Sequence, residues 1–266
     1  MDAEISLKTS VDVARIRRAS RVAEKCLRYL APCVRAGITT IELDRLAGRF
    51  LESSGAHPTL RGYRGFPGCI CTSVNNVAAH GIPTNSELAG GDVVSLDITT
   101  SVDGWHGDAA WSFIVGEGSP DARRLLKAAW TACLAGIRVA RAGNRIGDVG
   151  AAIQQAAHRS GCSVIEDYVG HGIGRAMHED PMVPNFGAVD TGIRIVPGMV
   201  FTIEPMLNLG GREVYISSDG WTLATSDGSL SAQFEHTVAV FRDYTEVLTF
   251  SQGDIFDFAE APPSLA

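Results

Sequence analysis

The pattern of apolar and polar positions predicts a β-hairpin over residues 91–116. Two apolar runs, each long enough for a strand, flank an Asp103-Gly104 pair. Asp-Gly between such runs favours a tight turn, because both residues tolerate the positive φ angles of a two-residue hairpin loop. The segment is therefore expected to run out and back as two antiparallel strands.

Two acidic side chains lie inside this hairpin. A two-residue loop places Thr99 opposite Asp108 and Asp97 opposite Ala110, so the two aspartates share one face as diagonal neighbours roughly 7–8 Å apart. At that separation they can bind metal ions spaced about 3.5–4 Å apart. One such acid alone would suggest an edge or bulge position facing water. Two acids buried together without a partner would be costly, which favours a cation between them.

Helical periodicity occurs on both sides of the hairpin. Helices are predicted over residues 11–30, 39–55, 120–142 and 146–160. Ser10 is expected to cap the first, Thr39 and Glu42 to form a capping box at the second, and Ser119-Pro120 to begin the third. Short strands with many turns are expected from 164 to 250, and residues 259–266 are expected to be frayed.

The second half of the chain repeats features of the first. Arg35-Ala36-Gly37 recurs as Arg141-Ala142-Gly143, and Ser54-Gly55 recurs as Ser160-Gly161 at the same spacing. At a spacing one residue longer, the segment from 91 to 97 corresponds to the segment from 198 to 204. Each half is therefore expected to contain two helices and a strand that ends in an acid. Chance similarity between amphipathic helices is common, but the matched glycines and the matched acid favour a duplicated α+β unit. The sequence thus predicts a single domain over 1–266 with copies at about 10–115 and 116–250.

Composition narrows the class of protein. The 266 residues are 45% hydrophobic and carry a net charge of −7 with no block of Lys or Arg, unlike a protein with a broad nucleic-acid surface. The N-terminus lacks the apolar core of a signal peptide, and no apolar run is long enough to cross a bilayer. Six cysteines without a CxxC pair favour free thiols in a reducing compartment. The sequence therefore predicts a cytoplasmic protein that binds neither DNA nor membranes.

Four more residues of metal-ligand type follow the hairpin. His171 lies in the glycine-rich GHGIG, His178 in MHEDP, Glu204 in TIEPM and Glu235 in SLSAQFEHT. Imidazole together with carboxylate suits Mn, Fe, Co or Zn better than Ca. Four carboxylates close together need counter-charges, so two divalent ions are expected, with His171 as a neutral ligand. Taken singly, each of these residues has another explanation. His171 could be a loop histidine, Glu204 could end a strand, and Glu235 could be a cross-strand salt-bridge partner.

The other histidines of the chain are not expected to bind the metal ions. His57, His158 and His236 are expected to be structural or exposed, and His236 should point away from the face that Glu235 uses. His106 shares a face with Asp108, so it either contacts a metal ligand without binding the metal itself or has no role at the site.

Five motifs together resemble one family. AHGIP, the Asp97–Asp108 hairpin, GHGIGRAMHEDP, FTIEP and SAQFEHT, in this order over about residues 10–250, resemble methionine aminopeptidase of the bacterial type I class. The resemblance implies the α+β pita-bread fold of creatinase and the aminopeptidases, with two halves related by a pseudo-twofold axis around a central antiparallel sheet. It also implies a metal-dependent aminopeptidase that removes the N-terminal methionine from nascent proteins whose second residue is small, by attack of a water activated by two metal ions.

The resemblance assigns a role to each motif. It implies five metal ligands: Asp97, Asp108, His171, Glu204 and Glu235. Asp108 and Glu235 would bridge the two ions, which could be Co, Mn, Fe, Zn or Ni, and Asp97 would bind one of them with both oxygens. Glu204 would also transfer the proton, and His80 and His178 would contact the substrate and stabilise the charged species of the reaction.

Two further sets of residues follow from the resemblance. A methionine pocket would be lined by Tyr63, Phe66, Cys71, Met177 and Trp221, although ordinary core packing would also account for these residues. A monovalent cation, Na or K, would be held by Asn75, Val77 and Ser231. Four positions around the site depart from the family pattern: Leu60, Asn76, Ala79 and Ala109.

Two other functions are considered. The pocket residues and the lack of a large preceding domain argue against an X-Pro peptidase or amidinohydrolase of the same fold. The five occupied ligand positions argue against a binding protein without catalysis. The expected partners are nascent polypeptide N-termini and, transiently, the ribosome, and the protein is expected to act as a monomer.

Overall fold

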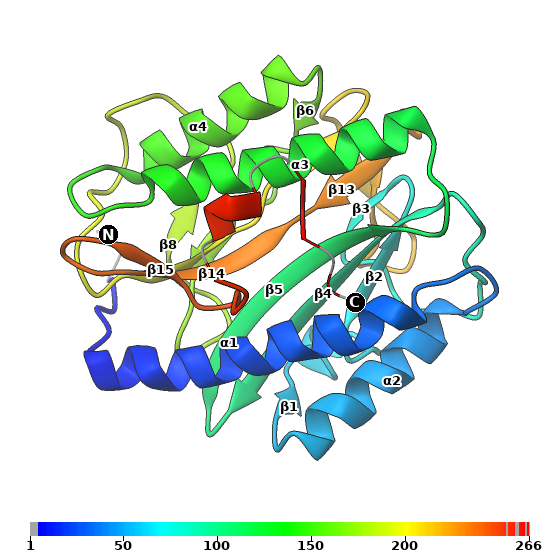
Figure 1. Cartoon of the computed structure of the whole chain (residues 1–266), viewed down its shortest axis with the longest axis horizontal. Coiled ribbons are helices and arrows are strands. Elements are labelled where there is room, and N and C mark those ends of the chain that lie inside the picture. Colours follow the sequence, from blue (N-terminus) through cyan, green and yellow to red (C-terminus); the bar gives the residue numbers. More distant parts are fainter. Residues whose placement is uncertain (1–4, 254, 259–260, 264, 266) are drawn as a thin grey trace.

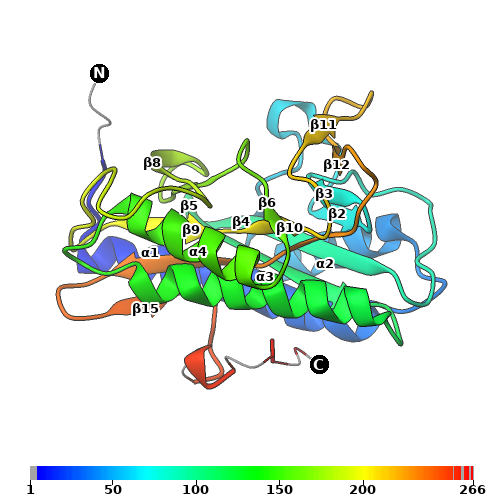
Figure 2. The same cartoon turned by 90° about the horizontal axis from the view of Figure 1, so that it is seen from above.

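Four long helices lie on one side of the sheets in this computed structural model, whereas strands β8 and β11 lie on the other side (Figures 1 and 2). The structure describes residues 5–253, 255–258, 261–263 and 265. The helices are α1 (Ser10–Leu30), α2 (Thr40–Ser53), α3 (Pro120–Val139) and α4 (Ile146–Arg159), with short 3-10 turns η1 (Ala31–Cys33), η2 (Tyr63–Gly65) and η3 (Ile255–Phe258). Within the described ranges, no helix combines the length and the apolar character needed to cross a membrane.

The strands form one large sheet and two small ones, and every pairing is antiparallel. The main sheet has the spatial order β1 (His57–Pro58), β4 (Val93–Val102), β5 (Trp105–Ile114), β14 (Glu235–Val240), β9 (Val200–Ile203), β7 (Gly170–Gly172) and β8 (Glu179–Val183). Two further strands join it, with β2 (Cys71–Val74) on β4 and β15 (Thr245–Val247) on β14. The small sheets are β13 (Ser231–Gln233), β10 (Met206–Asn208) and β6 (Ser163–Val164), and β11 (Val214–Ile216), β12 (Leu223–Thr225) and β3 (Val77–Ala79).

The predicted hairpin is confirmed as β4 and β5. Its loop contains the two residues Asp103 and Gly104, both at positive φ. The register pairs Thr99 with Asp108 and Asp97 with Ala110, as the loop length predicted. The hairpin therefore holds its two acids on one face.

Helix α1 packs directly against this hairpin. A Cβ added at Gly107 of β5 would lie 2.3 Å from the backbone nitrogen of Ser20, so only glycine allows this approach of helix and strand. Farther along the sheet, Trp111, Trp130 and Phe234 pack edge to face or tilted, with ring centroids 5.1–5.4 Å apart. These contacts hold the helices against one face of the sheet and leave the other face for the site.

Several predicted element ends differ from the structure. Helix α1 is capped by Thr9 rather than Ser10, because Thr9 and Asp12 complete a reciprocal capping box. The capping box of Thr39 and Glu42 is confirmed. Helix α3 ends at Val139, before the expected residue 142, because Ala140 leaves the helical conformation with a ψ of 72° and the side-chain amide of Asn144 donates to the carbonyl of Val139.

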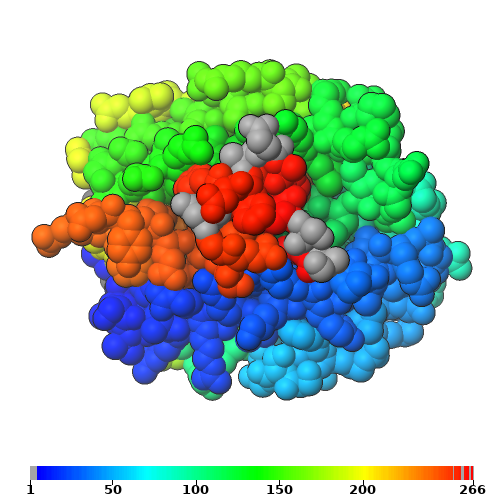
Figure 3. All heavy atoms as spheres, viewed as in Figure 1, coloured from blue at the N-terminus to red at the C-terminus, as the bar shows by residue number. Residues whose placement is uncertain are grey.

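The C-terminal segment lies at the surface between α1 and α3 (Figure 3). Trp130 donates a hydrogen bond to the carbonyl of Phe258, and Arg138 lies over the ring of Phe256. Of the tail that was expected to be frayed, residues 259, 260, 264 and 266 lie outside the described residues. Leu265, however, is 7% exposed and belongs to the main core, so fraying is wrong for this residue: its apolar side chain is buried there.

We propose that the two halves of the chain are copies of one unit. The matched glycines share left-handed backbone angles, with φ of 84° and 100° at Gly37 and Gly143, 69° and 67° at Gly55 and Gly161, and 94° at both Gly91 and Gly198. One detail of the expected repeat is wrong: β4 does not end at Asp97. Its pairing with β5 continues to Val102, so this acid lies in the middle of a strand.

Candidate metal centre

Five adjacent strands of the main sheet each bring one potential metal ligand to the same region. The order β4-β5-β14-β9-β7 places these residues side by side, although they are far apart in the sequence. The residues are Asp97 on β4, Asp108 on β5, Glu235 at the start of β14, Glu204 directly after β9 and His171 on β7. The sheet therefore brings together all five ligand candidates that the sequence suggested.

The register explains why three of the acids share a face. Ala110 of β5 pairs with Asp97 on one side and with Glu235 on the other. Residues directly opposite one another across strands point the same way, and Asp108 is two positions from Ala110, so its side chain does too. The small side chain of Ala110 leaves the space between the carboxylates open.

The imidazole of His171 faces these carboxylates. Its Nε2 lies 3.6 Å from Oε1 of Glu204 and 3.9 Å from Oδ2 of Asp108. One potential ligand atom from each of Asp108, His171 and Glu235 lies within 4.8 Å of the others. Nδ1 of His171 lies 3.0 Å from the carbonyl of Gly172, which can only accept, so Nδ1 carries the proton and Nε2 has a free lone pair.

The electrostatics of the cluster call for a cation. Burial, with the charge of neighbouring acids added to it, raises the pKa of Asp97, Glu204 and Glu235 well above the ordinary values. Burial also raises the pKa of Asp108, although a hydrogen bond from Thr99 opposes it, and burial lowers the pKa of His171 to about 4. In the described part of the chain, the ion pairs found for these acids involve His171 and no Lys or Arg. A donor set of four crowded carboxylates and one neutral imidazole fits divalent cations of the Mn, Fe, Co or Zn type.

Two threonines that sequence reasoning missed support the acids. Thr99 donates a hydrogen bond of 2.9 Å to Oδ1 of Asp108, and Thr202 donates one of 2.7 Å to Oε1 of Glu204. Thr202 also accepts the backbone N–H of His171 at 3.0 Å. Each threonine lies two residues from an acid in the sequence, Thr99 from Asp97 and Thr202 from Glu204. This spacing puts the side chains on one face of the sheet and was the available signal.

A cavity of about 1020 Å³ opens onto the ligand cluster. Its wall includes His80 and His178, the two histidines expected to contact substrate, and burial lowers the pKa of each to about 4. The ring of His178 lies 4.3 Å from that of His171, and its Nδ1 lies 3.3 Å from the hydroxyl of Tyr63. His80 packs edge to face against Tyr168, with the ring centroids 5.5 Å apart.

The five residues expected to line a methionine pocket lie together beside this cavity. They form one apolar cluster with Leu60 and Ile82, the second of which the sequence did not suggest: Tyr63, Phe66, Cys71, Met177 and Trp221. Phe66 lies behind the cavity wall, where its ring packs against the edge of Trp221 at 5.1 Å. The other four contribute directly to the wall.

The residues suggested for a monovalent cation lie elsewhere, near the turn between β2 and β3. Asn75 adopts a φ of 55°, and its carbonyl accepts the N–H of Ser231. Val77 begins β3 two residues later. Because a carbonyl oxygen has a second lone pair, the Asn75 carbonyl can still bind a cation.

The other histidines lie outside the ligand cluster. His57 and His158 are exposed, as expected. His236 is buried and bonds Thr249 through Nδ1, on the opposite face from Glu235. His106 lies against the carbonyl of Gly174, 3.2 Å from its Nδ1, and thus contacts the loop between His171 and His178.

Comparisons with known proteins give matches in both sequence and structure. The chain matches metallopeptidase family M24 over residues 14–241. It is 46% identical to methionine aminopeptidase A from Synechocystis sp. over 249 residues, which is 93% of this chain and 98% of that protein. The crystal structure of methionine aminopeptidase from Rickettsia prowazekii matches with a TM-score of 0.91 and 42% identity, over 92% of this chain and 100% of the other.

A more distant structure shares the fold alone. The prolidase from Pyrococcus furiosus matches with a TM-score of 0.72 at 18% identity, over 92% of this chain and 66% of the prolidase. Together with the closer matches, it confirms the pita-bread α+β fold.

Proposed function

The chain belongs to the methionine aminopeptidases of metallopeptidase family M24 and is thus a hydrolase, and we propose that it releases N-terminal methionine from polypeptides whose second residue is small. One observation carries this proposal. Five potential ligands from adjacent strands meet at the base of a cavity whose wall also contains an apolar pocket. A metal cluster beside such a pocket suits cleavage next to an apolar N-terminal residue.

Two divalent cations, of Co, Mn, Fe, Zn or Ni, would be held by the five ligand candidates. Their negative charge and their burial support this proposal, because cations would offset the burial that raises the pKa of all four acids and the repulsion that adds to it at Asp97, Glu204 and Glu235. When bound, the cations would lower the pKa of the attacking water and polarise the scissile carbonyl. A monovalent ion, Na or K, at Asn75, Val77 and Ser231 is part of the same proposal.

Glu204 is the proposed proton carrier. Its carboxylate lies next to His171 and is oriented by Thr202, so it can accept the proton of the attacking water and pass it to the leaving amine. This general acid–base role requires a carboxylate in the cluster with a fixed orientation. The hydrogen bond from Thr202 provides that orientation.

His80 and His178 are proposed to contact the substrate. The Tyr63 hydroxyl lies near Nδ1 of His178, which leaves Nε2 for the carbonyl oxygen of the cleaved bond as its charge develops. His80 lies on the cavity wall with Tyr168 and Trp221 packed against its ring, and these contacts fix its position.

The side chain of the first residue would enter the apolar cluster. Leu60, Cys71 and Met177 are buried there, and Tyr63 and Trp221 add aromatic edges. A thioether sulfur beside aromatic rings is favourable by about 0.3–1.5 kcal/mol for each contact. These contacts favour methionine over a side chain that lacks sulfur or is shorter.

The cellular setting follows from this activity. The substrates would be nascent polypeptide N-termini in the cytoplasm, reached through a transient contact with the ribosome. The protein would act as a monomer, since one chain brings the five ligand candidates together and this cluster needs no residue of a second copy.

The test is release of methionine from Met-Ala-Ser by metal-loaded protein. We expect methionine to be released, with no cleavage of Ala-Pro-Ser and no activity after chelation of the metal. Cleavage of Ala-Pro-Ser in preference to Met-Ala-Ser would instead show an X-Pro peptidase. Asp108→Ala and Glu204→Ala should each abolish release while circular dichroism shows an intact fold.

A further inference from the structure

The cavity extends beyond the space that two residues need. Its volume of about 1020 Å³ is at the upper end of the range of pockets that enclose a whole drug-sized ligand. A methionine and a small second residue fill only its inner part, next to the ligand cluster. The outer part is lined by residues that have no place in the chemistry described above.

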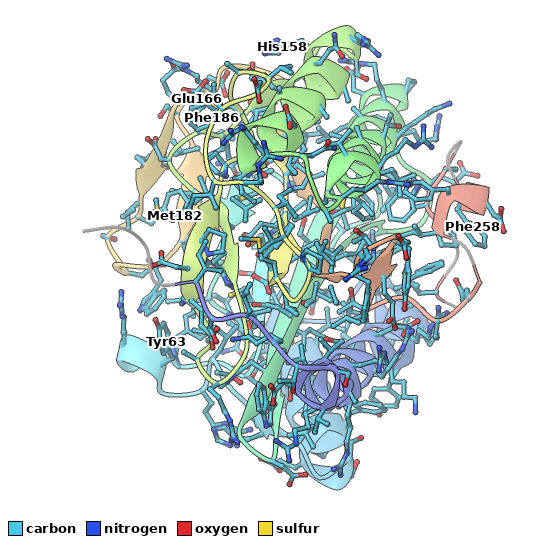
Figure 4. All side chains as sticks on the ribbon, turned by 90° about the vertical axis from the view of Figure 1, so that its left-hand side faces the viewer. Tyr63, His158, Glu166, Met182, Phe186 and Phe258 are labelled. Carbon is cyan, nitrogen blue, oxygen red and sulfur yellow. The ribbon has the colours of Figure 1, made fainter. Side chains whose placement is uncertain are left out.

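Two edge strands form the rim of this outer part. Strand β8 ends the main sheet and contributes Met182, and β11 ends a small sheet and contributes Ile216. Both strands lie on the side of the molecule away from the long helices (Figure 2). Met182 lies on the same side of the molecule as Tyr63 of the cavity wall, whereas Phe258 lies on the far side (Figure 4).

The side chains on this rim are apolar and unusually exposed. Met182 is 63% exposed and Ile216 is 55% exposed. Exposed apolar side chains grouped around a cavity mouth commonly mark a binding surface. Outside the ligand cluster, one basic and two acidic side chains line the cavity: Arg64, Glu179 and Asp180. Glu179 is paired with Lys8, so the remaining charges of Arg64 and Asp180 balance. Apolar contact is therefore the main attraction that this rim offers.

The path of a substrate chain identifies what passes over the rim. An aminopeptidase holds the first residue of its substrate at the base of the cavity, so the rest of the polypeptide must leave through the mouth. Among the residues that line the cavity, Met182 and Ile216 are the large apolar side chains that are exposed, so we place them at this mouth. We propose that these two side chains form a subsite for residues three to five of the substrate, which favours apolar residues there. This inference rests on the proposed function and extends it to the residues that follow the cleaved bond.

The effect should appear in KM. Contacts made equally in the ground state and the transition state tighten binding without changing the chemical step. If each side chain loses about 30 Å² of exposed apolar area, kcat/KM should rise about tenfold. We therefore expect metal-loaded protein to cleave Met-Ala-Leu-Val-Leu-Lys with about tenfold higher kcat/KM than Met-Ala-Ser-Ser-Ser-Lys, through a lower KM.

The variant Met182→Ser/Ile216→Ser tests the assignment to these residues. It should lose the preference between the two hexapeptides and cleave Met-Ala-Ser as the wild type does. Val189→Ser is the matched control, because Val189 is 74% exposed and does not line the cavity. This control should keep the full preference.

Each outcome has a definite meaning. Equal cleavage of the two hexapeptides by the wild type would overturn the subsite, even if the double variant failed to fold. Retention of the preference by a folded double variant would also overturn it. Failure to release methionine from any peptide, Met-Ala-Ser included, would contradict the proposed function instead.

Discussion

The hydroxyl of Thr202 donates a hydrogen bond of 2.7 Å to Oε1 of Glu204. Thr202 lies in β9 and Glu204 directly follows this strand, two positions further on, so their side chains point to the same side. The bond fixes one oxygen of a largely buried carboxylate to which we assign proton transfer. The orientation of Glu204 therefore depends on a neighbour that carries no charge.

Replacing Thr202 by valine should lower kcat about 10- to 100-fold, the loss expected when a charged group loses one hydrogen bond. The measurement is steady-state cleavage of Met-Ala-Ser. Thr202→Ser keeps the hydroxyl and should retain most of the activity. A serine variant as slow as the valine variant would show that the methyl group, and not the hydrogen bond, matters.

Asp97→Asn should stabilise the metal-free protein. Because burial raises the pKa of Asp97 above its value in the unfolded chain, the charged form opposes folding at neutral pH. Removing that charge should raise the Tm in EDTA by about 3 °C, the shift that roughly 1 kcal/mol gives in a protein of this size. The rise in Tm on adding Mn²⁺ should be smaller than in the wild type.

Asp103→Asn is the control for this experiment. Asp103 lies in the loop of the same hairpin, where its side chain is exposed and asparagine tolerates its positive φ. The Tm in EDTA should change little. A metal-free Asp97→Asn protein less stable than the wild type would contradict the view that the charge of Asp97 opposes folding.

Glu24 should make the stability of the protein depend on pH. Burial alone would raise its pKa, but hydrogen bonds from Ser251, Arg21 and Arg28 outweigh burial and lower the pKa below the ordinary value of 4.5. A lowered folded-state pKa means that the charged form stabilises the fold above about pH 4.5. This contribution is lost as the pH falls through the folded-state pKa.

The variant Glu24→Gln should lose about 2 kcal/mol of unfolding free energy at pH 7. The measurement is urea unfolding of wild type and variant at several pH values, and the difference between them should shrink below pH 4. Glu117→Gln serves as control, because Glu117 is exposed. A difference that stayed constant with pH would contradict the assignment.

Gly107→Ala should destabilise the protein by about 3 kcal/mol or more, because the added Cβ would lie 2.3 Å from the backbone of Ser20. Neither backbone can move without separating α1 from the hairpin. Gly90→Ala is the matched control, since nothing lies within 4 Å of its added Cβ. Equal thermal stability of the two variants would show that α1 packs less closely than described.

The sequence predicted most where the signals were local. The Asp103-Gly104 turn determined the register of β4 and β5, and with it the shared face of Asp97 and Asp108. The cap of α1 could also have been predicted, because Thr9 and Asp12 have capping-box spacing and Ser10 has no such partner.

Long-range pairing could not be derived from spacing. Glu235 reaches the hairpin because β14 pairs with β5 across more than a hundred residues, and only the resemblance to a family connected these motifs. Thr99 and Thr202 were missed for a different reason. Each lies two residues from an acid, but threonine is common in strands for its branched shape, so this spacing alone does not single out a hydroxyl that binds a carboxylate.

The central claim is that Asp97, Asp108, His171, Glu204 and Glu235 together hold two divalent cations. Calorimetric titration of metal-free protein with Mn²⁺ tests it most directly, with Asp108→Ala titrated beside the wild type. We predict that the wild type binds two ions per chain and that the variant binds fewer or binds them far more weakly. Identical titration curves for the two proteins, or no binding by either, would contradict the claim.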